Sequence, residues 1–229
     1  MFLNEYSYEQ RISSFLAGVY GWMCCALVVT AGAAYYVASQ EWLFAAIQQP
    51  GVLIGLFIVQ IGLVIGLSYF LNRLSFASAL IMFLLYSASL GVTLSSIFYI
   101  YTQMSIMITF LVTAGMFGVM SLYGYMTRSD LTTVGSISFM ALIGLIIGML
   151  VNMFLRSSSF DYILSGIGVI IFVLLIAYDT QKLKQFARPL IIDQESMAKI
   201  TIIGSLMLYL DFINLFLFLL RFLGQKREE

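Results

Sequence analysis

Two aspartates lie inside apolar, membrane-length segments of this chain, where their residue type and position allow ion chemistry. Asp179 follows the apolar run 170–178, and Asp211 follows the apolar run 206–210. Moving a carboxylate from water into hydrocarbon costs from about 3 to more than about 10 kcal/mol. A chain that keeps two carboxylates there, on consecutive segments, is expected to use them for protons or cations.

The two carboxylates predict a pH-sensitive ion site if they meet. Both cannot ionise cheaply at close range, so the pair would share a proton. Arg73, at the end of the second apolar segment, would act as a latch that binds the ionised pair and competes with a cation for its oxygens. Asn214, three residues after Asp211, offers a further oxygen ligand or donor. Because oxygen ligands favour Ca²⁺, Asp179 and Asp211 are its candidate ligands.

The depths of the two aspartates permit this pairing without requiring it. Asp179 lies one helical turn before Lys182, about 5 Å from a cation near the membrane surface. Asp211 lies 12 residues after Lys199, which corresponds to a depth of about 18 Å in a straight helix. The alternative is that both aspartates brace helices structurally, as hydrogen-bonding groups.

Enzyme chemistry fits the sequence less well. The chain has no histidine, which excludes Ser-His and Cys-His catalysis and histidine-ligated zinc. Presenilin-type proteases use a Tyr-Asp and a Gly-x-Gly-Asp motif; Tyr178 and Asp179 match the first motif, but no glycine precedes Asp211. We therefore expect no enzyme activity and no bound cofactor, with Ca²⁺ as a transported or regulatory ion.

Composition identifies a membrane protein. Of the 229 residues, 62% are hydrophobic and 10% are charged, whereas soluble domains carry about 25% charged residues. The net charge of zero gives no indication of nucleic-acid binding. The apolar segments do not alternate with polar residues, as the strands of a membrane barrel would, so helices are expected.

Seven apolar segments predict an all-α membrane protein that crosses the lipid bilayer seven times. We expect a tail at 1–11, a transmembrane domain at 12–222 and a second tail at 223–229, with one longer polar connection at 183–199. The segments are 12–38, 51–71, 75–98, 104–126, 131–154, 159–182 and 200–222.

The distribution of lysine and arginine predicts the orientation. With seven crossings, seven basic residues lie on the N-terminal side and four on the other, which places the N-terminus in the cytoplasm. If the last segment re-entered instead of crossing, the division would be ten against one, so charge alone leaves the side of the C-terminus open. We expect a full crossing because 200–222 is long enough to span.

Small residues recur at four-residue spacing in several segments. Such pairs let helices approach closely in lipid, either within the bundle of this chain or in a homodimer. The pairs are Gly51/Gly55, Gly62/Gly66 and Gly144/Gly148.

The chain resembles the Bax inhibitor family, the transmembrane Bax-inhibitor-motif proteins, and most closely the inner-membrane members of Gram-negative bacteria. The resemblance covers nearly the whole chain, and its longest motifs contain the two aspartates. The matching segments are 177–184 (AYDTQKLK), 208–216 (LYLDFINLF), 113–118 (TAGMFG), 121–125 (SLYGY), 94–98 (LSSIF) and 19–23 (VYGWM).

The resemblance implies seven helices, with the last helix in the centre of the other six. It also implies a Ca²⁺ leak that is gated by pH through a di-aspartyl pair, which falls on Asp179 and Asp211, and an arginine latch, which falls on Arg73. Other members suppress cell death or modulate a membrane protease. The alternative function is therefore a non-conducting regulator of a membrane protease or of a stress or cell-death pathway.

Overall fold

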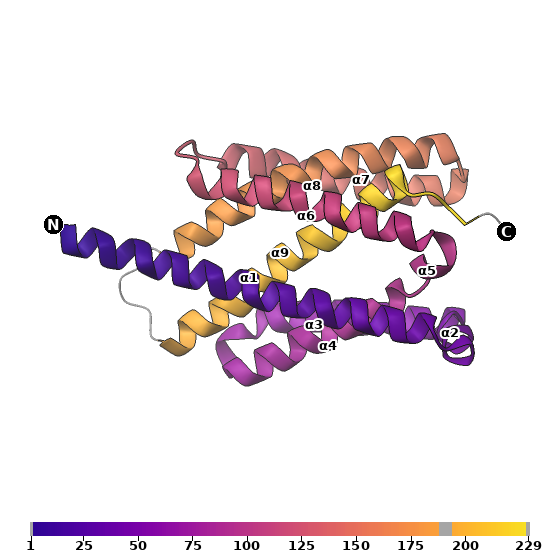
Figure 1. Cartoon of the computed structure of the whole chain (residues 1–229), viewed down its shortest axis with the longest axis horizontal. Helices are drawn as coiled ribbons and strands as arrows, with labels where there is room; N and C mark the ends of the chain where they lie inside the picture. Colours follow the sequence, from indigo (N-terminus) through magenta and orange to yellow (C-terminus); the bar gives the residue numbers. More distant parts are fainter. Residues whose placement is uncertain (1, 188–193, 228–229) are drawn as a thin grey trace. The chain divides into compact units, whose positions relative to one another are not determined.

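The structure is a computed structural model that describes residues 2–187 and 194–227 (Figure 1). Seven of the helices in these residues are long and apolar enough to cross a membrane, which confirms the predicted all-α, seven-span class. They are α1 (Phe2–Ala38), α3 (Pro50–Tyr69), α4 (Phe76–Leu94), α6 (Gln103–Met126), α7 (Thr132–Leu155), α8 (Ser158–Phe186) and α9 (Gln194–Leu223).

The connections differ from the prediction in two ways. Three short helices lie in segments expected to be loops or span ends: α2 (Glu41–Ile47), η1 (Leu71–Arg73) and α5 (Ile97–Ile100). In addition, α8 ends at Phe186 and α9 begins at Gln194, so the polar connection predicted at 183–199 is shorter at both ends. Its residues 188–193 lie outside the described residues, as do positions 1, 228 and 229 of the predicted tails.

The chain forms two compact units. The first contains Met1–Ile100 and Ala187–Tyr209, and the second contains Tyr101–Phe186 and Leu210–Glu229. Helix α9 is continuous from the first unit into the second. Asp179 and Asp211 both belong to the second unit, whereas Arg73 belongs to the first.

In the first unit, α1 and α4 pack closely around a buried polar group. A side chain at Gly91 would collide with the backbone carbonyl of Thr30, so glycine is needed at this approach. The Thr30 hydroxyl lies 2.6 Å from the Tyr209 hydroxyl of α9 and 3.0 Å from the carbonyl of Ser87. The Phe83 ring packs edge-on against Tyr209, 5.6 Å between centroids. These contacts join α1, α4 and the first part of α9.

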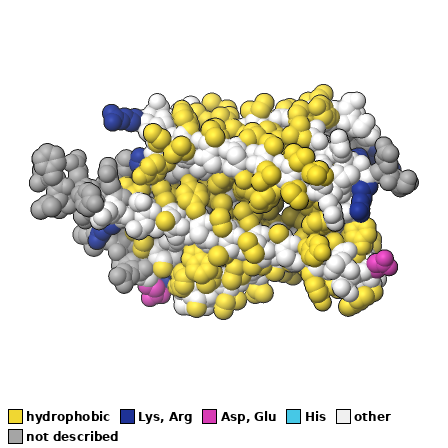
Figure 2. Space-filling view, viewed as in Figure 1, with side chains coloured by type: hydrophobic (Ala, Val, Ile, Leu, Met, Phe, Trp, Pro, Cys, Tyr) yellow, Lys and Arg dark blue, Asp and Glu magenta, His cyan; other side chains and the backbone are white. Residues whose placement is uncertain are grey.

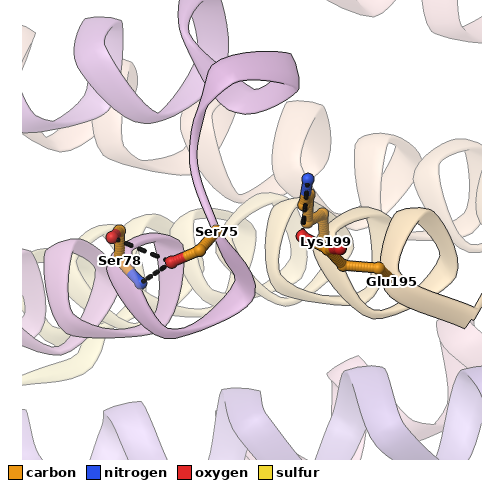
Figure 3. A network of polar contacts seen from close by, with 4 residues as sticks. All are labelled: Ser75, Ser78, Glu195 and Lys199. Atoms are coloured by element: carbon orange, nitrogen blue, oxygen red, sulfur yellow. Dashed lines mark hydrogen bonds and ion pairs between the residues drawn. The ribbon is translucent and has the colours of Figure 1, made fainter.

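Polar side chains also organise helix ends in the first unit (Figure 3). Ser75 caps α4, because its hydroxyl accepts a hydrogen bond of 3.2 Å from the backbone N–H of Ser78. In the first turns of α9, Lys199 pairs with Glu195 at 3.1 Å. Exposed pairs of this kind contribute at most about 1 kcal/mol, so the burial of apolar and aromatic side chains carries most of the stability.

In the second unit, two glycines allow close approach to α8. A side chain at Gly124 of α6 would collide with the carbonyl of Ala177, and one at Gly135 of α7 would collide with the Tyr178 ring. The glycine pairs predicted from spacing behave differently, because most of their members have open space around them. Only Gly66, near Met82, and Gly148, near Leu164, meet a neighbouring side chain among the six.

The segment after α9 pairs with the segment before α6. The N–H of Thr102 donates to the carbonyl of Gln225 at 3.1 Å, and the N–H of Gln225 donates to the Ser105 hydroxyl at 2.9 Å. The end of α9 therefore lies beside the beginning of α6. Helix α9 has no break from Gln194 to Leu223, and it is long and apolar enough to cross a membrane.

The surface is that of a lipid-embedded protein. Hydrophobic side chains are spread over the face seen in Figure 2, and the charged side chains visible there lie near its left and right margins. Helix α9 is an exception, because 72% of its most apolar stretch is buried, against 11–44% for the corresponding stretches of the other spans. The placement of α9 at the centre of the other six helices stays a prediction.

Candidate functional site

Asp179 of α8 and Asp211 of α9 meet in the second unit. Each is 5% exposed, and their carboxyl groups lie close enough to act directly on each other. One oxygen of each, Asp179 Oδ1 and Asp211 Oδ2, is buried without a hydrogen-bond partner. Two carboxyl groups this close cannot both ionise cheaply, so a shared proton is the state that their proximity favours. The two unpaired oxygens remain as acceptors.

The residues around Asp179 fix it from both sides. Tyr178 packs on Gly135 of α7, and the hydroxyl of Thr180 lies 3.4 Å from that of Ser121 on α6. Helix α8 therefore cannot rotate without breaking contacts to both neighbouring helices. This packing holds the Asp179 carboxyl in the interior of the unit.

Gln181 holds the connection between α6 and α7 against α8. Its Oε1 accepts a hydrogen bond of 2.9 Å from the N–H of Leu131, and its Nε2 donates to the carbonyl of Ser129 at 2.8 Å. One turn later, the Lys184 amine donates to the carbonyl of Tyr125 at 2.8 Å. Gln181 was not predicted from the sequence as a functional residue, although an amide two residues after Asp179, at the end of an apolar segment, was a signal for it.

The same connection contains an acidic side chain that binds the start of α7. The carboxylate of Asp130 accepts hydrogen bonds from the backbone and hydroxyl of Thr132 at 2.9 and 2.6 Å. The hydroxyl bond is the larger of the two effects that hold the pKa of Asp130 below its ordinary value. These bonds tie Asp130 to the first residue of α7, whose N-cap residue, Leu131, provides no side-chain cap.

A cation and an amide lie near the pair on its two helices. Lys182 acts electrostatically on Asp179, and its amine lies 5.6 Å from the centroid of the Tyr178 ring. Asn214 is half-buried, and its amide N–H donates to the carbonyl of Leu210 at 2.8 Å. The donor of Asn214 is thus used within α9, which leaves its amide oxygen as the group that could assist a cation.

Arg73 is exposed at the end of η1 in the first unit. Because Asp179 and Asp211 belong to the second unit, the latch contact stays a prediction.

Comparisons with known proteins agree with the motifs. The family described as inhibitor of apoptosis-promoting Bax1 matches residues 12–228. The inner membrane protein YbhL of Escherichia coli K12 is 49% identical, over 94% of this chain and 93% of its own length. A protein of Borreliella burgdorferi is 48% identical over 95% and 94%. A membrane protein of Streptococcus pyogenes serotype M1 is 33% identical over 94% of each chain. With a family match over almost its whole length and seven membrane-spanning helices, the chain belongs to the Bax inhibitor family of multi-pass membrane proteins.

Proposed function

We propose that this protein is a pH-sensitive cation leak of a bacterial inner membrane, with Ca²⁺ as the transported ion and the Asp179–Asp211 pair as its gate. The observation that supports the proposal most directly is the pair itself. Two carboxyl groups are buried side by side within membrane-spanning helices, and each keeps an oxygen without a hydrogen-bond partner. Such groups are costly in a membrane and are typical of ion and proton pathways.

The pair can switch between two charge states. At high pH the loss of the shared proton leaves two carboxylates that repel each other and attract a cation. At low pH both groups are protonated, and their attraction for Ca²⁺ or for a guanidinium disappears. Acid therefore releases any positive group that the pair holds. Acid also weakens Ca²⁺ binding to the same oxygens. Because these two effects oppose each other, the flux is expected to peak at intermediate acidity.

The ligand set suits an ion in transit. A closed Ca²⁺ site supplies about six to eight oxygens, and within the described residues no group of three or more His, Cys, Asp or Glu side chains gathers. Two carboxylates and the Asn214 amide oxygen would hold Ca²⁺ weakly, with water completing its shell. Weak, partly hydrated binding is what conduction requires, because an ion must also leave.

The charge rule supports a cytoplasmic N-terminus, so the Asp130 and Gln181 end of the second unit would also face the cytoplasm. In this view the protein performs no enzymatic reaction and needs no resident cofactor. The competing function is a non-conducting regulator that binds a membrane protease or another membrane protein. A flux measurement separates the two, because a regulator of this kind needs no ion pathway.

The test is Ca²⁺ flux into liposomes that contain the purified full-length protein, measured between pH 5 and pH 8. We expect a pH-dependent flux that becomes independent of pH in Asp179→Asn and in Asp211→Asn. Glu195→Gln is the matched control, because it removes an exposed carboxylate in the first turn of α9, the helix that carries Asp211. A wild-type protein with no flux at any pH, or two asparagine variants with the wild-type pH profile, would contradict the proposal.

A further inference from the structure

We propose that the buried face of α6 lines the cation path of the second unit, with hydroxyl groups as its walls and Phe117 as its apolar gate. The inference rests on the proposed leak function and adds the route that the ion takes on one side of the aspartyl pair.

The buried residues of α6 form a stripe of hydroxyl groups. The buried positions recur every four residues, and all carry a hydroxyl group except Phe117. The stripe comprises Ser105, Thr109, Thr113, Phe117 and Ser121, and the close-packing Gly124 follows it. Thr109 and Thr113 are 2% and 0% exposed. Ser121 lies 16 residues after Ser105, a distance of about 24 Å along the helix, which is most of the ~30 Å of hydrocarbon.

The Thr113 hydroxyl has used its proton and can only accept. Thr113 donates its only hydroxyl proton to the carbonyl of Thr109, at 2.7 Å. Its oxygen keeps the capacity to accept a further hydrogen bond or to bind an ion. Oxygen atoms of this kind are ligands for hard cations such as Ca²⁺. The stripe therefore offers a cation partial replacement for water, without any fixed charge that would trap it.

One end of the stripe reaches the aspartyl pair. Ser121 contacts Thr180, the residue after Asp179, at 3.4 Å between hydroxyl oxygens. The unpaired carboxyl oxygens of Asp179 and Asp211 are a second, independent set of buried oxygen acceptors. At the other end, the Ser105 hydroxyl accepts a hydrogen bond from Gln225, in the segment that follows α9. The stripe thus runs from the pair to the end of the unit where α9 finishes.

Phe117 interrupts the stripe between Thr113 and Ser121. Its ring packs edge-on against Phe212, with 5.5 Å between centroids. Phe212 follows Asp211 directly, so any movement of Asp211 on α9 is transmitted to this aromatic contact. Two packed rings exclude water and close a path by dewetting. Phe117 and Phe212 thus form the closed gate, next to Asp211 on α9.

The first experiment compares variants of the full-length protein in liposomes. We expect Thr113→Val to lower Ca²⁺ flux by roughly fivefold, because one oxygen ligand is lost at constant shape. Phe117→Ala is expected to raise the flux at pH 7.5. The matched control is Thr201→Val, which removes a hydroxyl with the same kind of bond, 2.9 Å to the carbonyl four residues earlier, in the first unit.

The outcomes separate the path from the proposed function. If the wild-type protein conducts and the flux through Thr113→Val equals that through Thr201→Val, the proposed cation path along α6 is wrong and the leak function stands. If the wild-type protein does not conduct, the leak function is wrong, and a second measurement decides about the path.

That measurement is the reaction of single cysteines with a small cationic thiol reagent at pH 8. The background replaces Cys24 and Cys25 with serine and both aspartates with asparagine, which imitates the uncharged pair. We expect Thr113→Cys to react and Leu111→Cys, which is 63% exposed on the lipid-facing side, to stay unmodified. An unreactive Thr113→Cys overturns the hydrated path whether or not the protein conducts.

Discussion

The hydroxyl oxygen of Tyr209 lies 2.6 Å from that of Thr30, and it joins the last helix to the first. Thr30 has a single hydroxyl proton, for which the carbonyls of Ala26 and Ser87 compete at 2.9 and 3.0 Å. Tyr209 is therefore the donor to Thr30. The Tyr209 side chain is fully buried, so this bond fixes both the rotation and the depth of α9 within the first unit.

We predict that Tyr209→Phe lowers the free energy of unfolding in detergent by about 1 kcal/mol, the usual contribution of a hydrogen bond between membrane helices. The measurement is thermal or denaturant unfolding. Tyr123→Phe is the control, because Tyr123 is 50% exposed on α6. Equal stability of the two variants would show that the bond to Thr30 contributes nothing.

Much of this fold could be predicted from the sequence, because a bilayer allows few solutions. A span needs about 20 apolar residues and must satisfy its own backbone, so length and hydropathy identify it. The predicted spans and the observed helices agree to within a few residues, except that α1 begins at Phe2 and that the helices extend into 183–199. There Lys184 stays helical because its amine reaches the carbonyl of Tyr125, a contact between distant segments that hydropathy cannot reveal.

The site was less predictable. The residue types of Asp179 and Asp211 indicated an ion site, but whether they meet depended on helix ends and tilts that packing decides. The depth estimate took Lys199 as the start of the last helix, and α9 begins five residues earlier, at Gln194. The hydroxyl stripe of α6 had a visible four-residue period, but only the structure shows that this face is buried rather than exposed to lipid.

We predict that Gln181→Met releases the 127–131 connection. Methionine has a similar length but no amide, so the N–H of Leu131 and the carbonyl of Ser129 lose their partners, at about 1–3 kcal/mol for each group that stays buried and unpaired. Faster hydrogen exchange of the 127–131 amides, together with a lower melting temperature, would report it. Gln103→Met, at an exposed position at the start of α6, is the control. Unchanged exchange would remove Gln181 from this role.

We predict that the α6–α7 connection and the end of the chain lie on opposite sides of the membrane. The reason is that α9 crosses without a break and ends beside the start of α6. Single cysteines at Ser129→Cys and Gln225→Cys, in a protein without Cys24 and Cys25, preserve the charge of both ends. An impermeant thiol reagent added to intact cells should label Gln225→Cys alone. Labelling of Ser129→Cys alone would reverse the orientation expected from the basic residues.

The last prediction concerns Arg73 as the latch of the pair. An arginine at a helix end has an inexpensive alternative, which is to extend into the lipid headgroups. It turns inward only if an ionised carboxylate holds it, and a bias of about 1.4 kcal/mol changes the ratio of open to closed protein tenfold. Protonation of Asp179 and Asp211 removes that attraction, so acid favours opening and neutral pH favours closure.

We therefore predict that Arg73→Ala raises Ca²⁺ flux in liposomes at pH 7 to 8 and flattens its pH response, and that Arg73→Lys does so less because the charge is kept. Arg128→Ala is the matched control, since Arg128 is also an exposed arginine in a connection between spans, on the side of the membrane where the charge rule places Arg73. The comparison at pH 7 to 8 is decisive, because the latch should be closed there in the wild type. A folded Arg73→Ala protein that leaks no more than Arg128→Ala would exclude Arg73 from the gating mechanism.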